Sequence, residues 1–275
     1  MPETLDARSS QAAEWIQSRW PATPKFGIVL GTGAGQLADR MTPEAIFPYS
    51  EIPHFPRSTA LGHKGQLVCG KLCGQPVVAM QGRFHLYEGY DVDHSTLAIH
   101  TMHRLGVRQL MISNAAGGIN PKFRSGEIML INSHIDLMNR SSRNFVGPQT
   151  IDRPLVRCDL AYDRNLIQQA LQCARRNGFQ VHQGVYVGML GPNFETRAEY
   201  RFLRRIGGDT VGMSTVPEVY VAARYGIRVL AMSIVTNVAK PDVLDATSGE
   251  EVIDAAKLAA PHLRALVENA ISANS

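Results

Sequence analysis

The sequence is poor in cysteine, and its few cysteines show neither a ligand pattern nor a disulfide pattern. Four occur in 275 residues, unevenly spaced at Cys69, Cys73, Cys158 and Cys173. Cys69 and Cys73 alternate with apolar residues, as neighbours on a strand do. The spacing therefore favours reduced thiols in the core over metal ligands, and it predicts no metal site.

Long hydrophobic runs and basic stripes are also lacking. No apolar run approaches the ~18 residues that a membrane helix needs, and the polar N-terminus has no apolar secretory core. Net charge is +4, but the 28 Lys and Arg residues are scattered among 24 acids. The densest basic spots, Arg175-Arg176 and Arg204-Arg205, lie in amphipathic helical patterns, where solvated charge is usual. We expect a cytoplasmic protein that binds neither membranes nor nucleic acid.

Internal repeats and low-complexity tracts are absent, and short β-branched runs alternate with helical patterns. With 44% hydrophobic residues the chain can bury a full core, so we expect one domain over residues 1–275. The expected strands are Phe26–Leu30, Val77–Met80, Gln109–Ser113, Ile128–Ile131, Val185–Leu190, Thr210–Met213 and Val229–Val235. The expected helices are Ser95–Leu105, Leu166–Arg176, Arg197–Ile206, Val216–Arg224 and Glu251–Ile271. This alternation predicts an α/β domain with a large mixed β-sheet flanked by helices.

Two segments carry further local signals. Ser248 and Glu251 have the spacing of a capping box at the start of the last expected helix, and Pro261 is expected to kink that helix. Residues 138–160, in contrast, carry little periodicity. A loop of that length in a compact domain is usually a functional segment or a subunit contact.

Two glycine-rich segments follow expected strands. Gly31–Gly35 comes directly after the first strand, where backbone amides and the Thr32 hydroxyl can cradle a phosphate at a helix start. Gln36 stands where the dinucleotide fingerprint needs a small residue, and no Lys-Ser/Thr pair follows, so neither nucleotide motif is present. A structural tight turn is about as consistent with this segment as anion binding. Ser113–Gly118 is expected to be a second strand exit that allows a ligand close to the backbone.

The segment Gln81–Gly89 is the richest in functional side chains. It follows an apolar run, where a buried strand opens into a loop. Arg83 is a permanent cation with a planar set of donors, and His85 can gain charge near neutral pH. Tyr87 and Glu88 can bind hydroxyls. Together these residues suit an anion beside a polyol, and the alternative is a surface salt-bridge cluster.

Three further segments complete a set of motifs: Gly191–Thr196, Val211–Glu218 and Thr236-Asn237. With the three segments described above, they closely resemble the trimeric purine nucleoside phosphorylases. The resemblance runs from about Phe26 to Val267, and its motifs occur in the family's order. It implies reversible phosphorolysis of a purine (deoxy)ribonucleoside to free base and pentose 1-phosphate. It also implies a homotrimer that needs no metal or organic cofactor and uses inorganic phosphate as co-substrate.

Carried over residue by residue, the resemblance implies a site of three parts. The phosphate contacts are Thr32, His63, Arg83, His85, the Ala115 backbone amide and Ser214. The ribose contacts are Tyr87 and Met213. The base contacts are Ala116, Gly117, Phe194, Glu195, Val211, Thr236 and Asn237. Among all of these, the expected catalytic residues are His85, Glu195 and Asn237.

These residue types suit the chemistry. Breaking a purine N-glycosidic bond leaves positive charge on the sugar and negative charge on the base, and the site must stabilise both. Asn237 can donate to the purine N7 and O6 region, while Glu195 can accept from N1–H and the 2-amino group. A hydrogen bond to a charged acceptor contributes roughly 1.5–3 kcal/mol, which favours inosine and guanosine over adenosine.

Alternatives differ from this interpretation at particular residues. Relatives that cleave methylthioadenosine usually carry a small hydroxyl residue in place of Glu195 and an Asp in place of Asn237. A methylthioadenosine or broad-specificity phosphorylase is therefore the alternative within the class. A non-catalytic nucleoside sensor is the alternative outside it, as is a nicotinamide-dependent oxidoreductase suggested only by Gly31–Gly35.

The sugar end departs from the family's pattern. Gly249, beside Ser248, stands where the family presents a His to the 5′-hydroxyl. The family also places a Phe from a neighbouring subunit over the ribose, but the matching Asp152-Arg153 is followed here by Pro154-Leu155. The resemblance therefore leaves open what covers the ribose and what binds its 5′-hydroxyl.

Overall fold

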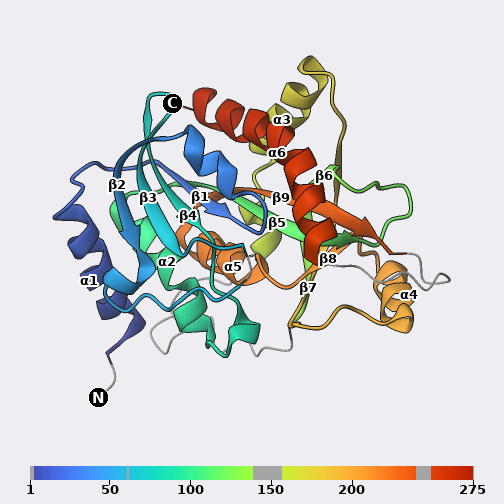
Figure 1. Cartoon of the computed structure of the whole chain (residues 1–275), viewed down its shortest axis with the longest axis horizontal. Coiled ribbons are helices and arrows are strands. Elements are labelled where there is room, and N and C mark those ends of the chain that lie inside the picture. The colour runs from blue at the N-terminus through green and yellow to red at the C-terminus, as the bar shows by residue number, and fades with distance from the viewer. Residues whose placement is uncertain (1–2, 61, 139–156, 240–248, 275) are drawn as a thin grey trace.

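A nine-stranded mixed β-sheet organises the computed structural model, which describes residues 3–60, 62–138, 157–239 and 249–274 (Figure 1). The strands are β1 (Phe26–Leu30), β2 (Thr42–Pro48), β3 (Gln66–Leu72), β4 (Gln75–Gln81), β5 (Gln109–Gly118), β6 (Ile128–Leu137), β7 (Val181–Met189), β8 (Thr210–Gly212) and β9 (Arg228–Val238). Their order is β2-β3-β4-β1-β5-β8-β7-β6-β9. Because β9 also pairs with β5, the last five strands in this order close into a ring.

Helices cover the sheet in two groups. The helices are α1 (Leu5–Gln17), α2 (Val92–Leu105), α3 (Arg164–Arg176), α4 (Arg197–Arg205), α5 (Val216–Tyr225) and α6 (Gly249–Ser272). Figure 1 shows α1, α2 and α5 together on one side of the sheet and α3 with α6 on the other, while α4 lies apart from both groups. Helix α6 contains Pro261 and bends along its length in Figure 1, as expected for an internal proline that lacks an N–H donor.

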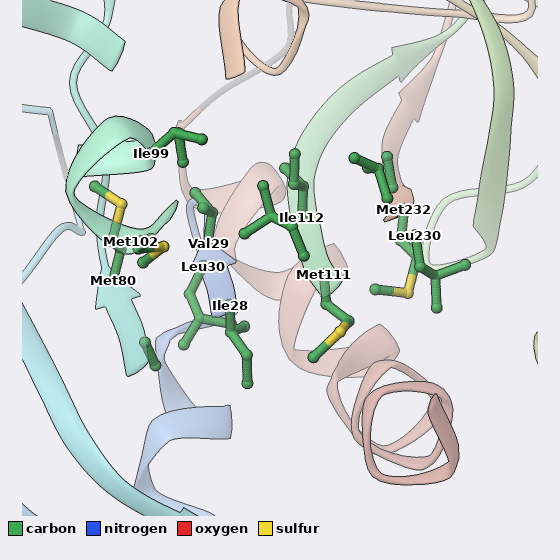
Figure 2. Close-up of a cluster of buried hydrophobic side chains, with 14 of the residues drawn as sticks. Ile28, Val29, Leu30, Met80, Ile99, Met102, Met111, Ile112, Leu230 and Met232 are labelled. Atoms are coloured by element: carbon green, nitrogen blue, oxygen red, sulfur yellow. The ribbon is translucent and has the colours of Figure 1, made fainter. Parts of the chain in front are cut away.

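The core lies where the central parallel strands meet these helices. Strand β1 is buried along its whole length, which explains its continuous apolar sequence. Figure 2 shows side chains from β1, β4, β5, β9 and α2 gathered in this core. A Cβ at Gly27 would lie 3.1 Å from Met102 Sδ, so the glycine lets α2 pack closely on β1.

Parallel pairing brings the expected site segments to one edge. Strand β1 is parallel to both β4 and β5, and β5 is parallel to β9. Their carboxyl ends therefore lie at the same edge of the sheet, where α/β proteins bind ligands.

All seven expected strands and all five expected helices are present, but two local predictions are wrong. Ser113–Gly118 is not a strand exit, because β5 continues to Gly118 by pairing with β9. The helix start expected after Gly31–Gly35 is a 3-10 helix over Gly35–Arg40. Strands β2 and β3 and helix α1 were not among the expected elements.

The cysteine prediction is partly wrong. Cys69 and Cys173 are buried, and burial raises the pKa of the Cys69 thiol to about 12. Cys73, however, is exposed in the β3–β4 turn, where its φ of 52° is compatible with a turn rather than with a strand. The Cys158 side chain lies outside the part of the chain that the structure describes.

Several other sequence features lie outside the described residues. They are Ser248 of the expected capping box, the segment Asp152–Leu155 and most of the loop at 138–160. Within the four described ranges, no group of three or more His, Cys, Asp or Glu side chains could hold a metal ion. No helix among the same residues is long and apolar enough to cross a membrane.

Candidate active site

A cavity of about 300 Å³ lies at the edge where β1, β4, β5 and β9 end. It is lined by every expected site residue except His63. These are Thr32, Arg83, His85, Tyr87, Ala115, Ala116, Gly117, Phe194, Glu195, Val211, Met213, Ser214, Thr236 and Asn237. The cavity is also lined by residues that the sequence did not single out individually for the site: Gly31, Ala60, Asn114, Pro192, Tyr200, Gly212 and Val252.

An irregularity between β5 and β9 shapes the inner wall of the cavity. Ala116 pairs with Val235, but the next residue, Gly117, pairs with Asn237, so Thr236 is an extra residue on β9. Such a bulge re-aims the side chains next to it. The Thr236 hydroxyl is 3.0 Å from Asn237 Oδ1 and 3.3 Å from the Ala116 carbonyl oxygen. The second contact links the bulge on β9 to the neighbouring strand β5.

The turn at Gly31 has a structural reason as well as a place in the cavity. A Cβ at Gly31 would lie 2.7 Å from the Ser113 carbonyl oxygen, so only glycine fits where the chain leaves β1 beside β5. Thr32 follows directly and lines the cavity. The turn therefore serves close packing and places a hydroxyl at the site.

Arg83 lines the cavity and is buried, with only 1% of its surface exposed. Its Nη1 donates to Thr215 Oγ1 at 3.1 Å and lies 3.3 Å from Glu218 Oε1, while its Nη2 donates to the Ser113 carbonyl oxygen. Glu218 thus offsets the buried positive charge. Arg83 Nε has no hydrogen-bond partner among the described residues. The alternative of a surface salt-bridge cluster is therefore wrong for this segment.

His85 is held by Glu88 in a fixed orientation. The His85 Nδ1 atom lies 3.0 Å from Glu88 Oε1, and His85 is 8% exposed. Burial raises the pKa of Glu88, but hydrogen bonds from His85 and Thr59 outweigh it and lower that pKa to about 2. The ionised carboxylate therefore holds a proton on Nδ1 and leaves Nε2 as the other polar atom of the ring. Glu88 itself does not line the cavity, so its expected hydroxyl contact is not supported.

His63 lies behind His85, outside the cavity lining. The two rings stack with centroids 5.4 Å apart, and His63 Nδ1 accepts the Arg83 backbone N–H at 3.2 Å. Burial, with His85 and Arg83 nearby, lowers the pKa of His63 to about 4. The ring is therefore neutral at pH 7 with its proton on Nε2, an atom that has no partner in the described part of the chain. His63 therefore presents a neutral N–H donor there and not a cation.

Ser214 and Met213 come from the turn between β8 and α5. The next residue, Thr215, has a φ of 72°, a strained value for a β-branched side chain. Its hydroxyl accepts from Arg83 and, at 2.8 Å, from Asn114 Nδ2. These bonds hold the turn that carries Ser214 and Met213 toward the cavity.

Glu195 and Asn237, polar residues from segments far apart in the chain, also line the cavity. Burial raises the pKa of Glu195, while a hydrogen bond from Tyr200 lowers it. Phe194, expected as a packing wall, also lines the cavity but is 57% exposed. No sequence signal pointed to Tyr200, because it lies in an ordinary amphipathic helical pattern.

Comparisons with known proteins show the family to which the chain belongs. Residues 25–272 match the family model described as "Phosphorylase superfamily". The chain is 44% identical over 265 residues to purine nucleoside phosphorylase 1 of Geobacillus stearothermophilus, covering 94% of this chain and 96% of that one. It matches a Schistosoma purine nucleoside phosphorylase in complex with hypoxanthine, with a TM-score of 0.90, 39% identity and 98% of each chain covered. The Schistosoma mansoni enzyme in complex with adenosine gives a TM-score of 0.90 at 40% identity, again with 98% of each chain covered.

Proposed function

Because this chain belongs to the phosphorylase superfamily, as a low-molecular-mass purine nucleoside phosphorylase, we propose that its cavity binds phosphate beside a 6-oxopurine nucleoside. The enzyme cleaves the nucleoside reversibly with phosphate, which gives free base and (deoxy)ribose 1-phosphate. One observation carries the proposal. The same cavity is lined both by anion donors and by the side chains of Glu195 and Asn237.

The phosphate end offers donors with little net charge. Thr32, Ser214 and the Ala115 amide line the cavity as neutral donors, and Arg83 Nε and His63 Nε2 are two buried donors without partners in the described residues. His85 also lines the cavity, and its Nε2 donates only when the ring carries a second proton. Glu218 neutralises part of the Arg83 charge. A dianion held this way stays nucleophilic, because neutral donors bind it without withdrawing as much charge as a free cation does.

The nucleoside lies between the two ends in this arrangement. Met213 and Tyr87 contact the ribose, and the bound phosphate faces the anomeric carbon. Positive charge that develops on the sugar is then stabilised by the phosphate, and negative charge on the base is stabilised at the opposite end. The base lies against Ala116, Gly117, Phe194, Val211 and Thr236, all of which line the cavity.

Base selection rests on two hydrogen-bonding side chains. Glu195 accepts from N1–H and from the 2-amino group of guanine, and Asn237 donates to the N7 and O6 region. Adenine has a bare N1 and leaves Glu195 unpaired, at a cost of about 1–3 kcal/mol. The proposed substrates are therefore inosine and guanosine, with phosphate as co-substrate and no metal or organic cofactor.

The function is tested by measuring base release with and without phosphate. We expect hypoxanthine from inosine only when phosphate is present, because the site offers anion donors and no evident general base for water. Guanosine, xanthosine, adenosine and methylthioadenosine, assayed in the same way, define the base preference. Equal rates with and without phosphate would indicate a hydrolase and contradict the proposal.

We also propose a homotrimer, on the strength of the family resemblance and of exposed apolar side chains on α4 and beside it. Phe194, Phe202 and Ile206 are more than a third exposed. Light scattering on the purified protein tests this, since a monomeric mass would contradict it. The cytoplasmic location stays a prediction.

The 5′ end of the sugar should be weakly recognised. Helix α6 begins at Gly249, and Val252 in its first turn lines the cavity, so this wall offers no side-chain donor at residue 249. Strong discrimination arises when a missing substrate group leaves buried site groups unpaired. We therefore expect 5′-deoxyinosine to reach kcat/KM within about tenfold of inosine.

Gly249→His is the matched variant for this prediction. It should widen the gap between inosine and 5′-deoxyinosine, because the imidazole can pair with the 5′-hydroxyl. A large preference for inosine in the wild type would show that another residue holds that hydroxyl.

A further inference from the structure

The buried hydroxyl of Thr215 connects three side chains of the cavity wall. Thr215 is 0% exposed and does not line the cavity itself. Its Oγ1 lies 3.1 Å from Arg83 Nη1, 2.8 Å from Asn114 Nδ2 and 3.2 Å from Ser214 Oγ. All three of these partners line the cavity. Thr215 therefore lies directly behind a part of the wall that includes two of the proposed phosphate contacts.

The backbone at Thr215 has an unfavourable conformation. Its φ of 72° is rarely adopted by a β-branched residue. The residue stands where the chain turns from β8 into α5, whose first residue is Val216. Such strain persists only where surrounding contacts fix it, and the three contacts of the hydroxyl can do so. A glycine would adopt this φ without strain but would offer no hydroxyl.

The donors around the Thr215 hydroxyl set the direction of its proton. A guanidinium has no acceptor, so Arg83 Nη1 can only donate to Oγ1, and Asn114 Nδ2 donates to the same oxygen. A hydroxyl has two lone pairs and one proton, so both lone pairs are then occupied. The Thr215 proton is left for Ser214 Oγ, which accepts it at 3.2 Å. Ser214 can therefore donate its own proton to a ligand in the cavity.

The backbone of Ser214 is fixed by a different strand. Its N–H donates at 3.2 Å to Oη of Tyr186, a fully buried residue of β7. Gly212 lets this phenol approach, because a Cβ at residue 212 would lie 2.6 Å from Tyr186 Oη. With its N–H held by Tyr186 and its Oγ held by Thr215, Ser214 has a fixed place in the cavity wall.

The same hydroxyl also contacts the Arg83 guanidinium. Nη1 donates to Thr215 and lies 3.3 Å from Glu218 Oε1, while Nη2 donates to the Ser113 carbonyl oxygen. Both terminal nitrogens are therefore engaged by the protein. Nε has no partner among the described residues, and a bound anion can satisfy this buried donor.

We propose that Thr215 is a positioning residue for phosphate, which orients the Ser214 hydroxyl as a donor and holds the Arg83 guanidinium. The proposal rests on the proposed function and adds a residue to its phosphate site. A serine that turned its lone pairs toward a phosphate dianion would repel it, whereas a serine that turns its proton toward the dianion binds it. Thr215 thus contributes to phosphate binding without touching phosphate.

Thr215→Val removes the hydroxyl and keeps a β-branched side chain of similar shape. We expect the KM for phosphate to rise about tenfold, because Ser214 loses the donor that orients it and Arg83 Nη1 loses an acceptor. The KM for inosine should change by less than about twofold, since the proposed base contacts are other residues. Thr215→Ser keeps the hydroxyl, so its KM for phosphate should stay within about threefold of the wild type.

Thr210→Val is the matched control, measured like the other variants in the full chain. Thr210 is a fully buried threonine of β8 whose hydroxyl lies 3.8 Å from Met129 Sδ, and it does not line the cavity. Steady-state kinetics give kcat and the KM values for phosphate and inosine. Melting curves with and without inorganic phosphate report phosphate binding without turnover, and they show whether each variant folds. We expect phosphate to stabilise Thr215→Val less than the wild type or Thr210→Val.

The Ser214→Ala background tests whether Thr215 acts through Ser214. With the serine hydroxyl already removed, Thr215→Val should raise the KM for phosphate by less than about threefold. Thr215→Gly is a second variant without the hydroxyl, and it relieves the strain at residue 215. It should weaken phosphate binding as Thr215→Val does, which separates loss of the hydroxyl from misfolding of a strained turn.

Rescue by serine and dependence on the background decide the interpretation. A raised KM for phosphate in Thr215→Val, restored in Thr215→Ser and reduced in the Ser214→Ala background, supports the positioning role. An unchanged KM for phosphate in Thr215→Val or Thr215→Gly overturns it, as does an equal rise in both backgrounds. A wild-type protein that does not cleave inosine with phosphate overturns the proposed function instead. The phosphate-dependent melting shift then still decides the role of Thr215.

Discussion

Glu195→Ala is expected to lower kcat/KM for inosine and guanosine by roughly 30- to 1000-fold, which corresponds to about 2–4 kcal/mol of transition-state binding. The carboxylate is the proposed acceptor for N1–H, and it also takes the Tyr200 hydrogen bond. The alanine variant therefore lacks the carboxylate that accepts the hydrogen bond from the base. Because Glu195 lines the cavity and is not part of the apolar core, the fold should persist.

Steady-state kinetics on the purified variant check this result, and a melting curve checks the fold. Glu14→Ala is the matched control, since Glu14 is an exposed residue on α1 whose side chain accepts from Ser10 and does not line the cavity. Near-wild-type turnover in Glu195→Ala would show that Glu195 does not bind the base.

The sequence predicted the central strands well because burial on both faces leaves a continuous apolar run. Strand β1 matches its predicted bounds for this reason. Strand β5 was cut short at Ser113, because the Asn, Ala and Gly residues that follow have weak strand propensity. Pairing with β9 extends it to Gly118, and that long-range pairing is not visible in a local pattern.

The missed elements have weak periodicity for identifiable reasons. Strand β2 is at the edge of the sheet and contains Pro43 and Pro48, which an edge tolerates and a central strand does not. Helix α1 buries Ser9, Ala12, Ala13 and Ile16, so small residues dominate its inner face. Neither pattern separates clearly from a loop at the level of sequence.

The site was predictable as a set of motifs but not as a set of protonation states and partners. The motifs contain Arg83 and Glu195, and the family resemblance adds His63 to the expected site residues. That Glu218 neutralises Arg83 and that burial keeps His63 neutral depends on segments far apart in the chain. Tyr200 was missed for a similar reason, because its place in the cavity lining depends on how α4 lies against the rest of the fold.

Asn237→Asp is expected to shift base preference from 6-oxopurines toward 6-aminopurines. The Asp carboxylate accepts from the exocyclic amine of adenine, whereas the Asn amide donates to the O6 of hypoxanthine. One matched hydrogen bond is lost with inosine and one is gained with adenosine, each contributing about 1–2 kcal/mol. The adenosine-to-inosine ratio of kcat/KM should therefore rise on the order of 100-fold.

Asn237→Ala separates the new acceptor from the lost donor. Alanine removes the amide without offering anything to the 6-amino group, so it should lower inosine cleavage yet raise the adenosine-to-inosine ratio by no more than about tenfold. Kinetics with both nucleosides on the two variants decide the matter. If the Asp variant keeps the wild-type ratio, recognition of position 6 lies elsewhere in the cavity. If Ala and Asp shift the ratio equally, loss of the donor explains the change and the carboxylate makes no bond to the base.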